Sequence, residues 1–323
     1  MVQLKIGTRG SELARWQANT VATLLRDRAV ADCEIVIIKT TGDRLSEARL
    51  SQIGGKRLFV KEIEDALLAG EVDLAVHSSK DMPAVLPDGL AIGAVLPRED
   101  ARDAIVLPRH VDEPLSVEEI VRELGREPRI GTSSVRRVAQ LTRLFPGAHF
   151  LPIRGNLDTR LRKLDTGDFD AIVLAAAGLR RLQQGSRISA FLPADRCVPA
   201  PGQGIIAVEI RDGDMAVATA VERIHDQRSG LALAAERAVV RRLGGGCQMP
   251  IGAHALIDGD AIAIHAIVVT PDGSRAAMAE INGRADEPEA AGDAAAELLL
   301  TRGAGDILED VQRQQAAVEG LQP

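Results

Sequence analysis

Basic side chains are concentrated between residues 129 and 163. This stretch holds eight lysines and arginines and one acidic residue, whereas the other 288 residues hold 31 basic and 45 acidic side chains. Because the chain as a whole carries a formal net charge of −7, the excess of arginine is local. Guanidinium groups bind carboxylates and phosphates in a bidentate manner. The stretch therefore predicts either a site for a strongly anionic ligand or a solvated helix face.

Two Gly-Thr turns are suited to bind such an anion. The segment 5–11 has a counterpart in 129–134, and each predicts a strand that leads through the turn into a helix N-terminus. Helix N-termini attract anions, and the hydroxyl groups of the turns add donors. A second repeat relates 70–76 to 167–173, where a helix ends at Gly before a buried strand headed by Asp. The repeats indicate two similarly built domains that could face each other across a cleft.

Two further clusters carry reactive side chains. His77, Ser78, Lys80 and Asp81 follow an apolar strand, and the carboxyl end of a strand is where α/β proteins place chemistry. The patterns typical of serine nucleophiles are missing, so this cluster could also be a paired and capped loop. Cys247 follows three glycines, which favour neither helix nor strand, and its thiol is expected on an accessible loop where it could react.

Other signals for phosphate or metal sites fail. Segment 202–207 has glycines at dinucleotide-binding spacing, but it is expected to precede a strand and not to open a helix. Gly-Gly-Lys at 54–56 lacks the spacing of a P-loop. Cys33, Cys197 and Cys247 are an odd number at wide spacing, and no two histidines have helical metal-ligand spacing. We therefore expect no metal site and no disulfide framework.

The elements that must position these residues follow from hydrophobic patterning. Short β-branched runs alternate with helical segments, which predicts α/β domains with mostly parallel sheets. Strands are expected at 4–6 and 34–39, and a helix is expected to start at Ser11 as its N-cap. A later helix is expected to start at Ser116, with Glu119 completing a capping box.

Composition narrows the classes of partner. The net negative charge argues against general binding to nucleic acid or anionic membranes, which favour basic domains. Aromatic residues make up 2% of the chain, so the stacking surfaces of single-stranded nucleic acid binders are scarce. No stretch reaches 18 apolar residues, and the N-terminus has no signal-peptide pattern. We expect a cytoplasmic protein with neither nucleic acid nor membrane as a partner.

In their order along nearly the whole chain, these motifs resemble the porphobilinogen deaminase (hydroxymethylbilane synthase) family. The resemblance rests on Gly7-Thr8-Arg9 with Ser11 and Trp16-Gln17, Gly54-Gly55-Lys56 with Leu58 to Glu62, Asp73 through His77-Ser78 to Lys80-Asp81, Arg98-Glu99-Asp100 with Arg102-Asp103-Ala104, Gly131 to Ser134 with Arg136-Arg137, Arg154-Gly155-Asn156, Thr159-Arg160-Leu161, Ala177-Gly178-Leu179, Gly202-Gln203-Gly204, and Gly245 to Gln248 with Pro250-Ile251-Gly252.

The resemblance implies a transferase. It would condense four porphobilinogen molecules head to tail into hydroxymethylbilane, with release of ammonia, in tetrapyrrole and haem biosynthesis. The family's cofactor is a dipyrromethane made from the substrate, which would be joined by a thioether to Cys247. The implied partners are porphobilinogen and the growing polypyrrole chain, and the implied oligomeric state is a monomer.

The resemblance also assigns roles to individual residues. Each ring carries an acetate and a propionate, so a growing chain gathers carboxylates that guanidinium groups bind. Asp81 matches the catalytic carboxylate, which would stabilise the cationic azafulvene left when ammonia departs. Arg129, Arg143 and Arg162 match no motif and are expected to be surface charge. The implied cofactor- and substrate-binding residues are Arg9, Ser11, Lys56, Phe59, Ser78, Lys80, Thr132, Ser133, Ser134, Arg136, Arg137, Arg154, Arg160, Arg181 and Gln203.

The implied fold has two doubly wound α/β domains of periplasmic-binding-protein type and a small α+β C-terminal domain. We expect residues 1–98 with 203–219 in the first domain and 99–202 in the second. Residues 220–323 would form the third domain, which carries the cysteine loop. Residues 40–57 are a candidate lid over the cleft.

Two other classes of protein remain open from the residues alone. A non-catalytic anion-binding protein of the same two-lobed architecture would need the arginines but neither Asp81 nor Cys247. A nucleic acid binder would need the basic stretch exposed as a continuous strip, with salt-dependent affinity. Only the deaminase would carry a covalent adduct on its cysteine.

Overall fold

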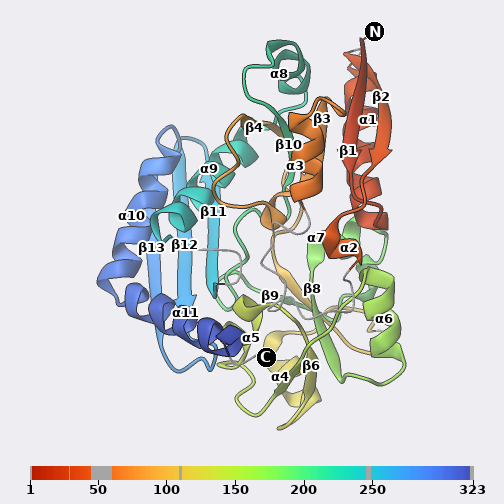
Figure 1. The fold of residues 1–323 in the computed structure, drawn as a ribbon. Helices are drawn as coiled ribbons and strands as arrows, with labels where there is room; N and C mark the ends of the chain where they lie inside the picture. Colours follow the sequence, from red (N-terminus) through yellow and green to blue (C-terminus); the bar gives the residue numbers. More distant parts are fainter. Residues whose placement is uncertain (1, 29, 45–59, 109–110, 245–248, 321–323) are drawn as a thin grey trace.

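The computed structural model describes residues 2–28, 30–44, 60–108, 111–244 and 249–320. Three of the predicted site residues, Lys56, Phe59 and Cys247, lie outside the described residues, as does most of the candidate lid. Within the described residues, the strands form three sheets (Figure 1). None of the described helices combines the length and the apolar character that a bilayer crossing demands.

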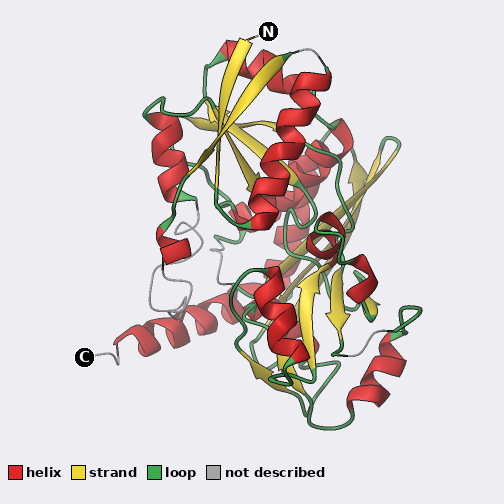
Figure 2. Ribbon diagram, turned by 90° about the vertical axis from the view of Figure 1, so that its right-hand side faces the viewer, coloured by secondary structure: helices red, strands yellow, loops and turns green. Residues whose placement is uncertain are grey.

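The first sheet has the strand order β2-β1-β3-β10-β4. Its strands are β1 (Val2–Thr8), β2 (Ala31–Ile37), β3 (Leu74–Ser78), β4 (Leu90–Val95) and β10 (Ile206–Arg211). Strand β1 is parallel to β2 and β3, whereas β10 is antiparallel to β3 and β4. Figure 2 shows helices flanking this twisted sheet on both sides. The associated helices are α1 (Glu12–Asp27), α2 (Thr41–Arg44), α3 (Lys61–Leu68) and α8 (Met215–Glu222).

The second sheet has the order β7-β6-β8-β5-β9. Its strands are β5 (Asp103–Val106), β6 (Arg129–Gly131), β7 (His149–Leu151), β8 (Ala171–Ala175) and β9 (Ala190–Leu192). The helices of this part are α4 (Val117–Leu124), α5 (Val135–Leu141), α6 (Leu157–Asp165) and α7 (Ala176–Arg181). The described residues of the two α/β parts also form the short 3₁₀ helices η3 (Ser79–Asp81), after β3, and η4 (Gly185–Arg187), after α7.

The two five-stranded sheets are built on one plan. Strands β6, β7 and β8 occupy the places that β1, β2 and β3 occupy in the first sheet, which confirms the two similarly built parts inferred from the repeats. The expectation of mostly parallel sheets is confirmed, because four strands of each sheet run in one direction, while β5 and β10 each run antiparallel to both neighbours. The chain enters the second sheet along β5 after a first crossing, from Leu96 to Asp103, and returns to the first sheet along β10 after a second crossing, from Pro193 to Ile205. Neighbouring strands become parallel when a crossover connection joins them, and a strand that arrives from the other sheet has no such connection.

The repeated aspartates perform the same task in both sheets. Asp73, before β3, accepts a hydrogen bond from the backbone N–H of Lys5 at 2.7 Å, and Asp170, before β8, accepts one from Arg129 N–H at 2.7 Å. In each pair the aspartate backbone N–H donates to the partner's carbonyl at 2.9 Å. The carboxylate therefore satisfies a backbone donor where two parallel strands begin. This explains why the motif occurs twice.

The third sheet is antiparallel and lies against its own helices. Its strands are β11 (Ile251–Asp258), β12 (Ala261–Val269) and β13 (Ala276–Arg284), in that order. The helices are α9 (Gln227–Arg242), α10 (Pro288–Thr301) and α11 (Ala304–Gly320). Small residues of α9 and α10 allow a close approach, and their buried face forms one apolar core with β11 and β12. Two α/β parts and a smaller α+β part confirm the predicted fold class, and the residue boundaries of the three domains stay a prediction.

Local signals in the sequence located most elements correctly. Ser11 caps α1 by accepting a hydrogen bond from Ala14 N–H, and Ser116 and Glu119 form the predicted capping box at α4. The strand predicted at 34–39 is β2, but it begins three residues earlier, at Ala31. Its extension follows from parallel pairing with the whole length of β1.

One buried ion pair joins the third sheet to the first crossing between the α/β parts. Arg98, which follows β4, donates from Nη1 and Nη2 to the two carboxylate oxygens of Glu236 on α9, at 2.7 and 2.9 Å. The same carboxylate accepts the backbone N–H groups of Gly202 and Ala255, each at 2.7 Å. Glu236 is fully buried, so these four contacts replace its hydration. Through these contacts, Glu236 connects the segment after β4, the second crossing and β11.

Removing this carboxylate should destabilise the protein strongly. Glu236→Ala removes the ionic partner of the largely buried Arg98 guanidinium and leaves the backbone N–H groups of Gly202 and Ala255 without their acceptor, and we expect a loss of about 3–5 kcal/mol in the free energy of unfolding. Urea titration followed by circular dichroism measures it. Glu297→Ala, which removes the partner of exposed Arg242, is the control, with an expected change within about 0.5 kcal/mol. A similar small change in both variants would contradict the prediction.

Candidate active site

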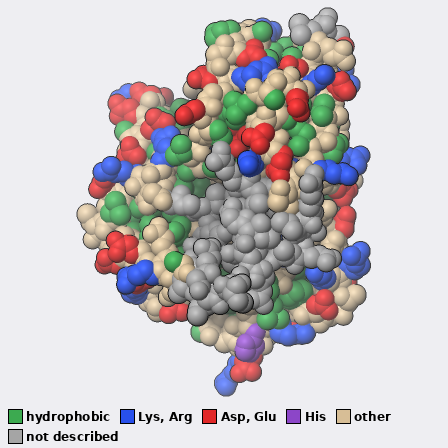
Figure 3. Space-filling view, viewed as in Figure 1, with side chains coloured by type: hydrophobic (Ala, Val, Ile, Leu, Met, Phe, Trp, Pro, Cys, Tyr) green, Lys and Arg blue, Asp and Glu red, His purple; other side chains and the backbone are tan. Residues whose placement is uncertain are grey.

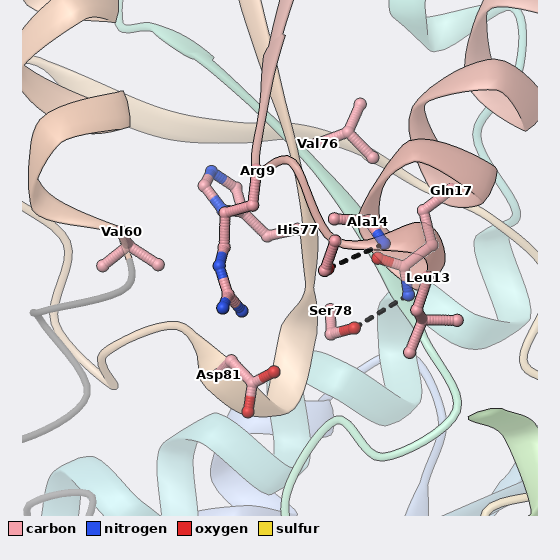
Figure 4. Close-up of a pocket in the computed structure, with 10 residues that line it drawn as sticks. Arg9, Leu13, Ala14, Gln17, Val60, Val76, His77, Ser78 and Asp81 are labelled. Carbon is pink, nitrogen blue, oxygen red and sulfur yellow. Dashed lines mark hydrogen bonds between the residues drawn. The ribbon is translucent and has the colours of Figure 1, made fainter. Parts of the chain in front are cut away.

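A pocket lies at the carboxyl ends of β1 and β3, between the first turn of α1 and η3 (Figure 4). The predicted site residues Arg9, Ser11, Ser78 and Asp81 line it together. Figure 4 shows the Arg9 side chain extending from the end of β1 toward the Asp81 carboxylate. The other lining residues are Leu13, Ala14, Gln17, Val60, Val76 and His77.

Two polar contacts fix the walls of this pocket. Gln17 of α1 is buried, and its Nε2 donates to Ser78 Oγ at 2.8 Å, which ties the helix to the end of β3. His77 Nε2 lies 3.1 Å from Oε2 of Glu209 on β10, and both side chains are buried. The sequence placed Gln17 in a family motif but not among the site residues, and it did not single out Glu209, because neither stands in a pattern typical of catalysis. Their positions follow from the pairing of strands distant in sequence.

The η3 turn that carries Lys80 and Asp81 is packed against the second crossing. Ser79 N–H donates to Ile205 O at 3.0 Å, and a Cβ on Gly202 would lie 2.5 Å from Ser79 Oγ. Gly202 also has a φ of +73°, which favours glycine. The small Ser79 and the glycine together let the crossing approach the turn closely. The catalytic candidates are thus held by backbone packing.

Lys80 points from this turn toward the second crossing. Its Nζ lies 3.4 Å from Oε1 of Gln203, which is fully buried. Burial lowers the pKa of Lys80 to about 8, and the positive charges of Arg137 and Arg136 act in the same direction. The carboxylates of Asp81 and Asp103 oppose this shift. Lys80 therefore lies within the electrostatic reach of both α/β parts.

Arg136 and Arg137 share one carboxylate. Asp103 heads β5 and accepts from Arg136 Nη2 at 2.7 Å and from Arg137 Nε and Nη2 at 3.0 and 2.7 Å. Arg136 is 5% exposed and Arg137 is 7% exposed. Burial alone would raise the pKa of Asp103, but the two guanidinium groups outweigh it and hold the pKa well below its usual range. The sequence predicted both arginines as ligand-binding residues and missed this partner, and their contact with a ligand stays a prediction.

Both guanidinium groups also donate to backbone carbonyls. Arg136 Nη1 donates to Val198 O at 2.7 Å, and Arg137 Nη1 donates to Val173 O at 2.9 Å. These contacts fix the planes of the two groups as well as their charge. A signal for the pairing was present, because Asp103 heads a strand of apolar residues where a carboxylate needs a buried partner.

Arg160 lies within electrostatic reach of Arg137 and of Asp81 on η3. Its Nε donates to Gly155 O at 2.8 Å. Burial lowers the pKa of Arg160 to about 10, with the charges of Arg137 and Arg154 adding to the shift and Asp81 opposing it. Burial also lowers the pKa of Arg154. The charges of residues on η3, α5 and α6 therefore act on one another.

Arg181 contacts the first sheet from α7. Its Nη2 donates to Gly204 O at 2.7 Å, and its guanidinium carbon lies 5.8 Å from the centre of the Trp16 ring. The side chain is 7% exposed, and burial lowers its pKa to about 10, with Glu99 opposing the shift. The structure thus places Arg181 at the junction of α1, α7 and the second crossing.

The three predicted hydroxyl donors serve the β6–α5 turn in this structure. Thr132 Oγ1 accepts from Ser134 N–H at 3.2 Å, and Ser134 Oγ caps α5. Ser133 Oγ donates to Ile153 O at 2.9 Å and lies 3.0 Å from Ile153 N–H. Thr132 is buried, whereas Ser133 is exposed. Their roles as ligand donors stay predictions.

The arginines expected at the surface do lie there. Arg129 pairs with Asp170, and Arg143 and Arg162 are exposed. On the face shown in Figure 3, basic and acidic side chains alternate and form no continuous basic strip among the residues drawn in colour. The arginines that are concentrated in the sequence therefore fall into different groups. Arg136 and Arg137 are buried, Arg160 lies near Asp81, and Arg129, Arg143 and Arg162 are at the surface.

Both cysteines in the described part of the chain are poor nucleophiles. Burial raises the pKa of the Cys197 thiol to about 12, with the nearby Asp103 carboxylate adding to the shift and the two arginines opposing it. Burial and the charge of Asp32 raise the pKa of Cys33. A thiol reacts as its thiolate, so neither residue is suited to attack a ligand at neutral pH.

Comparison with known proteins places this geometry in a family. Residues 4–219 match the family model described as porphobilinogen deaminase, dipyromethane cofactor binding domain, and residues 231–301 match the porphobilinogen deaminase C-terminal domain. The chain is 44% identical to porphobilinogen deaminase of Moorella thermoacetica, covering 99% of this chain and 100% of that one. It is 45% identical to the enzyme of Thiobacillus denitrificans, covering 96% and 99%. Immunogenic lipoprotein A from Vibrio vulnificus aligns with a TM-score of 0.43 at 13% identity, over 70% of this chain and 96% of that chain.

The fold and the site define a transferase with two α/β parts and a pocket at the carboxyl ends of β1 and β3. The chain belongs to the porphobilinogen deaminase family. It condenses porphobilinogen into hydroxymethylbilane with release of ammonia in tetrapyrrole biosynthesis, and its cofactor is a dipyrromethane. Of the classes that the sequence left open, family membership selects the enzyme.

The burial of Cys197 predicts how it reacts. In the native protein at pH 8, iodoacetamide should alkylate Cys197 at least about tenfold more slowly than in urea, because the folded thiol is neutral and covered. Peptide mass spectrometry with and without urea measures both rates. Equal rates in the two states would contradict the described burial.

Proposed function

We propose that the pocket between η3 and α1 is the place where each porphobilinogen loses ammonia, with Asp81 as the catalytic carboxylate. One observation carries the proposal. The Asp81 carboxylate shares its pocket with Arg9 and acts electrostatically on Lys80 and Arg160. A carboxylate placed among cations can stabilise the positive charge that develops on a pyrrole when its amine leaves.

The donor set of the cleft fits a dipyrromethane. The cofactor carries an acetate and a propionate on each ring, and burial lowers the pKa of Lys80, Arg154 and Arg160 in the structure described here. An anionic group among these side chains would offset their mutual repulsion. We propose that they hold the carboxylates of the cofactor and of the growing polypyrrole chain, together with Arg9 and Arg137. When bound, the cofactor supplies the pyrrole carbon to which the first unit is joined.

We further propose that Cys247 carries the cofactor through a thioether. The support is the family resemblance at its glycine-rich segment and the raised pKa of both described cysteines. The same resemblance supports Lys56 and Phe59 as ligand-contacting residues. It also supports a monomeric enzyme that works in the cytoplasm.

Replacing the proposed catalytic carboxylate should abolish most of the activity and leave the fold intact. Asp81→Asn keeps the shape of the side chain and removes its charge, and we expect kcat to fall at least about a hundredfold. Porphobilinogen consumption measures kcat, and circular dichroism checks the fold. Asp88→Asn, at an exposed turn seven residues further on, is the control and should retain activity. Near-wild-type turnover in Asp81→Asn would exclude the assignment.

The proposed attachment site predicts a change in mass. The intact enzyme should exceed the mass of its sequence by two pyrrole units, and Cys247→Ser should return to the sequence mass. Cys197→Ser is the control and should keep the added mass. Electrospray mass spectrometry of the three proteins decides the point, and an active enzyme without added mass would contradict the attachment.

A further inference from the structure

The Asp103 carboxylate links Arg136 and Arg137 of α5 to the second crossing, which leads back to the first sheet. Besides Arg136 and Arg137, it accepts from Gln203 Nε2 at 2.9 Å, and Cys197 Sγ lies at 3.5 Å. Asp103 is fully buried, and Gln203 lies 100 residues further along the chain. The hydrogen bond between the Gln203 and Asp103 side chains therefore connects the start of β5, in the second sheet, to the second crossing.

The contacts of Gln203 determine which way its amide faces. Nε2 donates to Ala101 O at 2.6 Å as well as to Asp103 Oδ1, so both acceptors lie on the same side of the amide. A flipped amide would place its oxygen against these two oxygens, which is unfavourable. Oε1 must therefore point the other way, and there it lies 3.4 Å from Lys80 Nζ. The ammonium precedes Asp81 in the chain by one residue.

We propose that Asp103 is a positioning residue for the condensation, which holds Lys80 beside Asp81 through the oriented amide of Gln203. The proposal rests on the role of Asp81 proposed above. Asp103 thus serves both walls of the cleft at once. On one wall it fixes the guanidinium groups of Arg136 and Arg137, and on the other it fixes the ammonium next to the catalytic carboxylate.

The balance of charge explains why this link matters for an anionic ligand. One carboxylate faces two guanidinium groups, so the cluster keeps a net positive charge while each group stays fixed by hydrogen bonds. Cations that are already oriented bind carboxylates without first reorganising. Because a displacement of about 1 Å can cost a hundredfold in rate, a relay of buried hydrogen bonds is an effective way to hold the catalytic turn.

Two variants distinguish the effect of the relay, which runs from Asp103 through Gln203 to Lys80, from the effect of the ion pairs of Asp103 with Arg136 and Arg137. Gln203→Met removes the amide and leaves the contacts of Asp103 with both arginines unchanged, so it avoids exposing buried charges. Asp103→Asn is the second variant. Within the described part of the chain, the charged groups that act on Lys80 include Asp81, Arg137, Asp103 and Arg136.

Two readouts are measured on the cofactor-loaded enzyme. The first is the pH at which reductive methylation of Lys80 is half-maximal, followed by peptide mass spectrometry. A hydrogen bond or a negative charge beside an ammonium favours its charged form, so both variants should lower the pKa of Lys80 and move this midpoint to lower pH. The second readout is kcat per loaded enzyme, which should fall on the order of tenfold to a hundredfold, with a much smaller change in KM.

Gln140→Met is the matched control. Gln140 is a buried glutamine of α5 whose amide makes two hydrogen bonds, both with the backbone of Val198 and neither with Asp103 or Lys80. It should lose similar stability, with the Lys80 midpoint and kcat unchanged.

The outcomes distinguish this proposal from the catalytic assignment. An unchanged Lys80 midpoint in Gln203→Met overturns the relay, and so does a normal kcat at a shifted midpoint. A midpoint that moves equally in Gln140→Met also overturns it, because the effect would then be general. An active Asp81→Asn enzyme would instead remove the catalytic role of Asp81, whatever the midpoint in Gln203→Met.

Discussion

The cost of burying a charge governs the centre of this molecule. Asp103 is fully buried, and a carboxylate in that position is tolerated only because two guanidinium groups and an amide surround it. The same contacts immobilise the two arginines, which otherwise have long and flexible side chains. The pairing of the buried Asp103 charge therefore holds two cationic side chains in fixed positions. A cleft that must receive a polycarboxylate benefits from this rigidity, because the ordering of its side chains has already occurred during folding.

The two chain crossings between the α/β parts carry most of the polar anchors. The first crossing contributes Arg98 and Asp103, and the second contributes Gly202 and Gln203. Glu236 of the third part binds both crossings through Arg98 and the Gly202 backbone. Consequently the three sheets meet around two short segments. Any movement of one α/β part against the other must either keep these contacts or break buried hydrogen bonds, which is costly.

The sequence predicted those features that depend on neighbours along the chain. The caps at Ser11 and Ser116 and the strand headed by Asp73 all follow from residues within a few positions of one another. The reversal of β5 and β10 and the pairing of Asp103 with Arg136 could not be predicted in this way. They depend on which sheet receives a strand and on partners 33 or more residues away. The family resemblance supplied the positions of the site but not their contacts.

The arginines show why a count of charges does not define a binding surface. Within one basic stretch, Arg129 pairs with an aspartate at the surface, Arg136 is buried against Asp103, and Arg160 lies near Asp81 in the cleft. Burial and partners separate these roles, and both are tertiary properties. A cation that is buried and only partly compensated keeps its attraction for an anion, because little water screens it. The local excess of arginine therefore matters through the few side chains that the fold buries near η3, and the Asp103 carboxylate fixes the orientation of two of them.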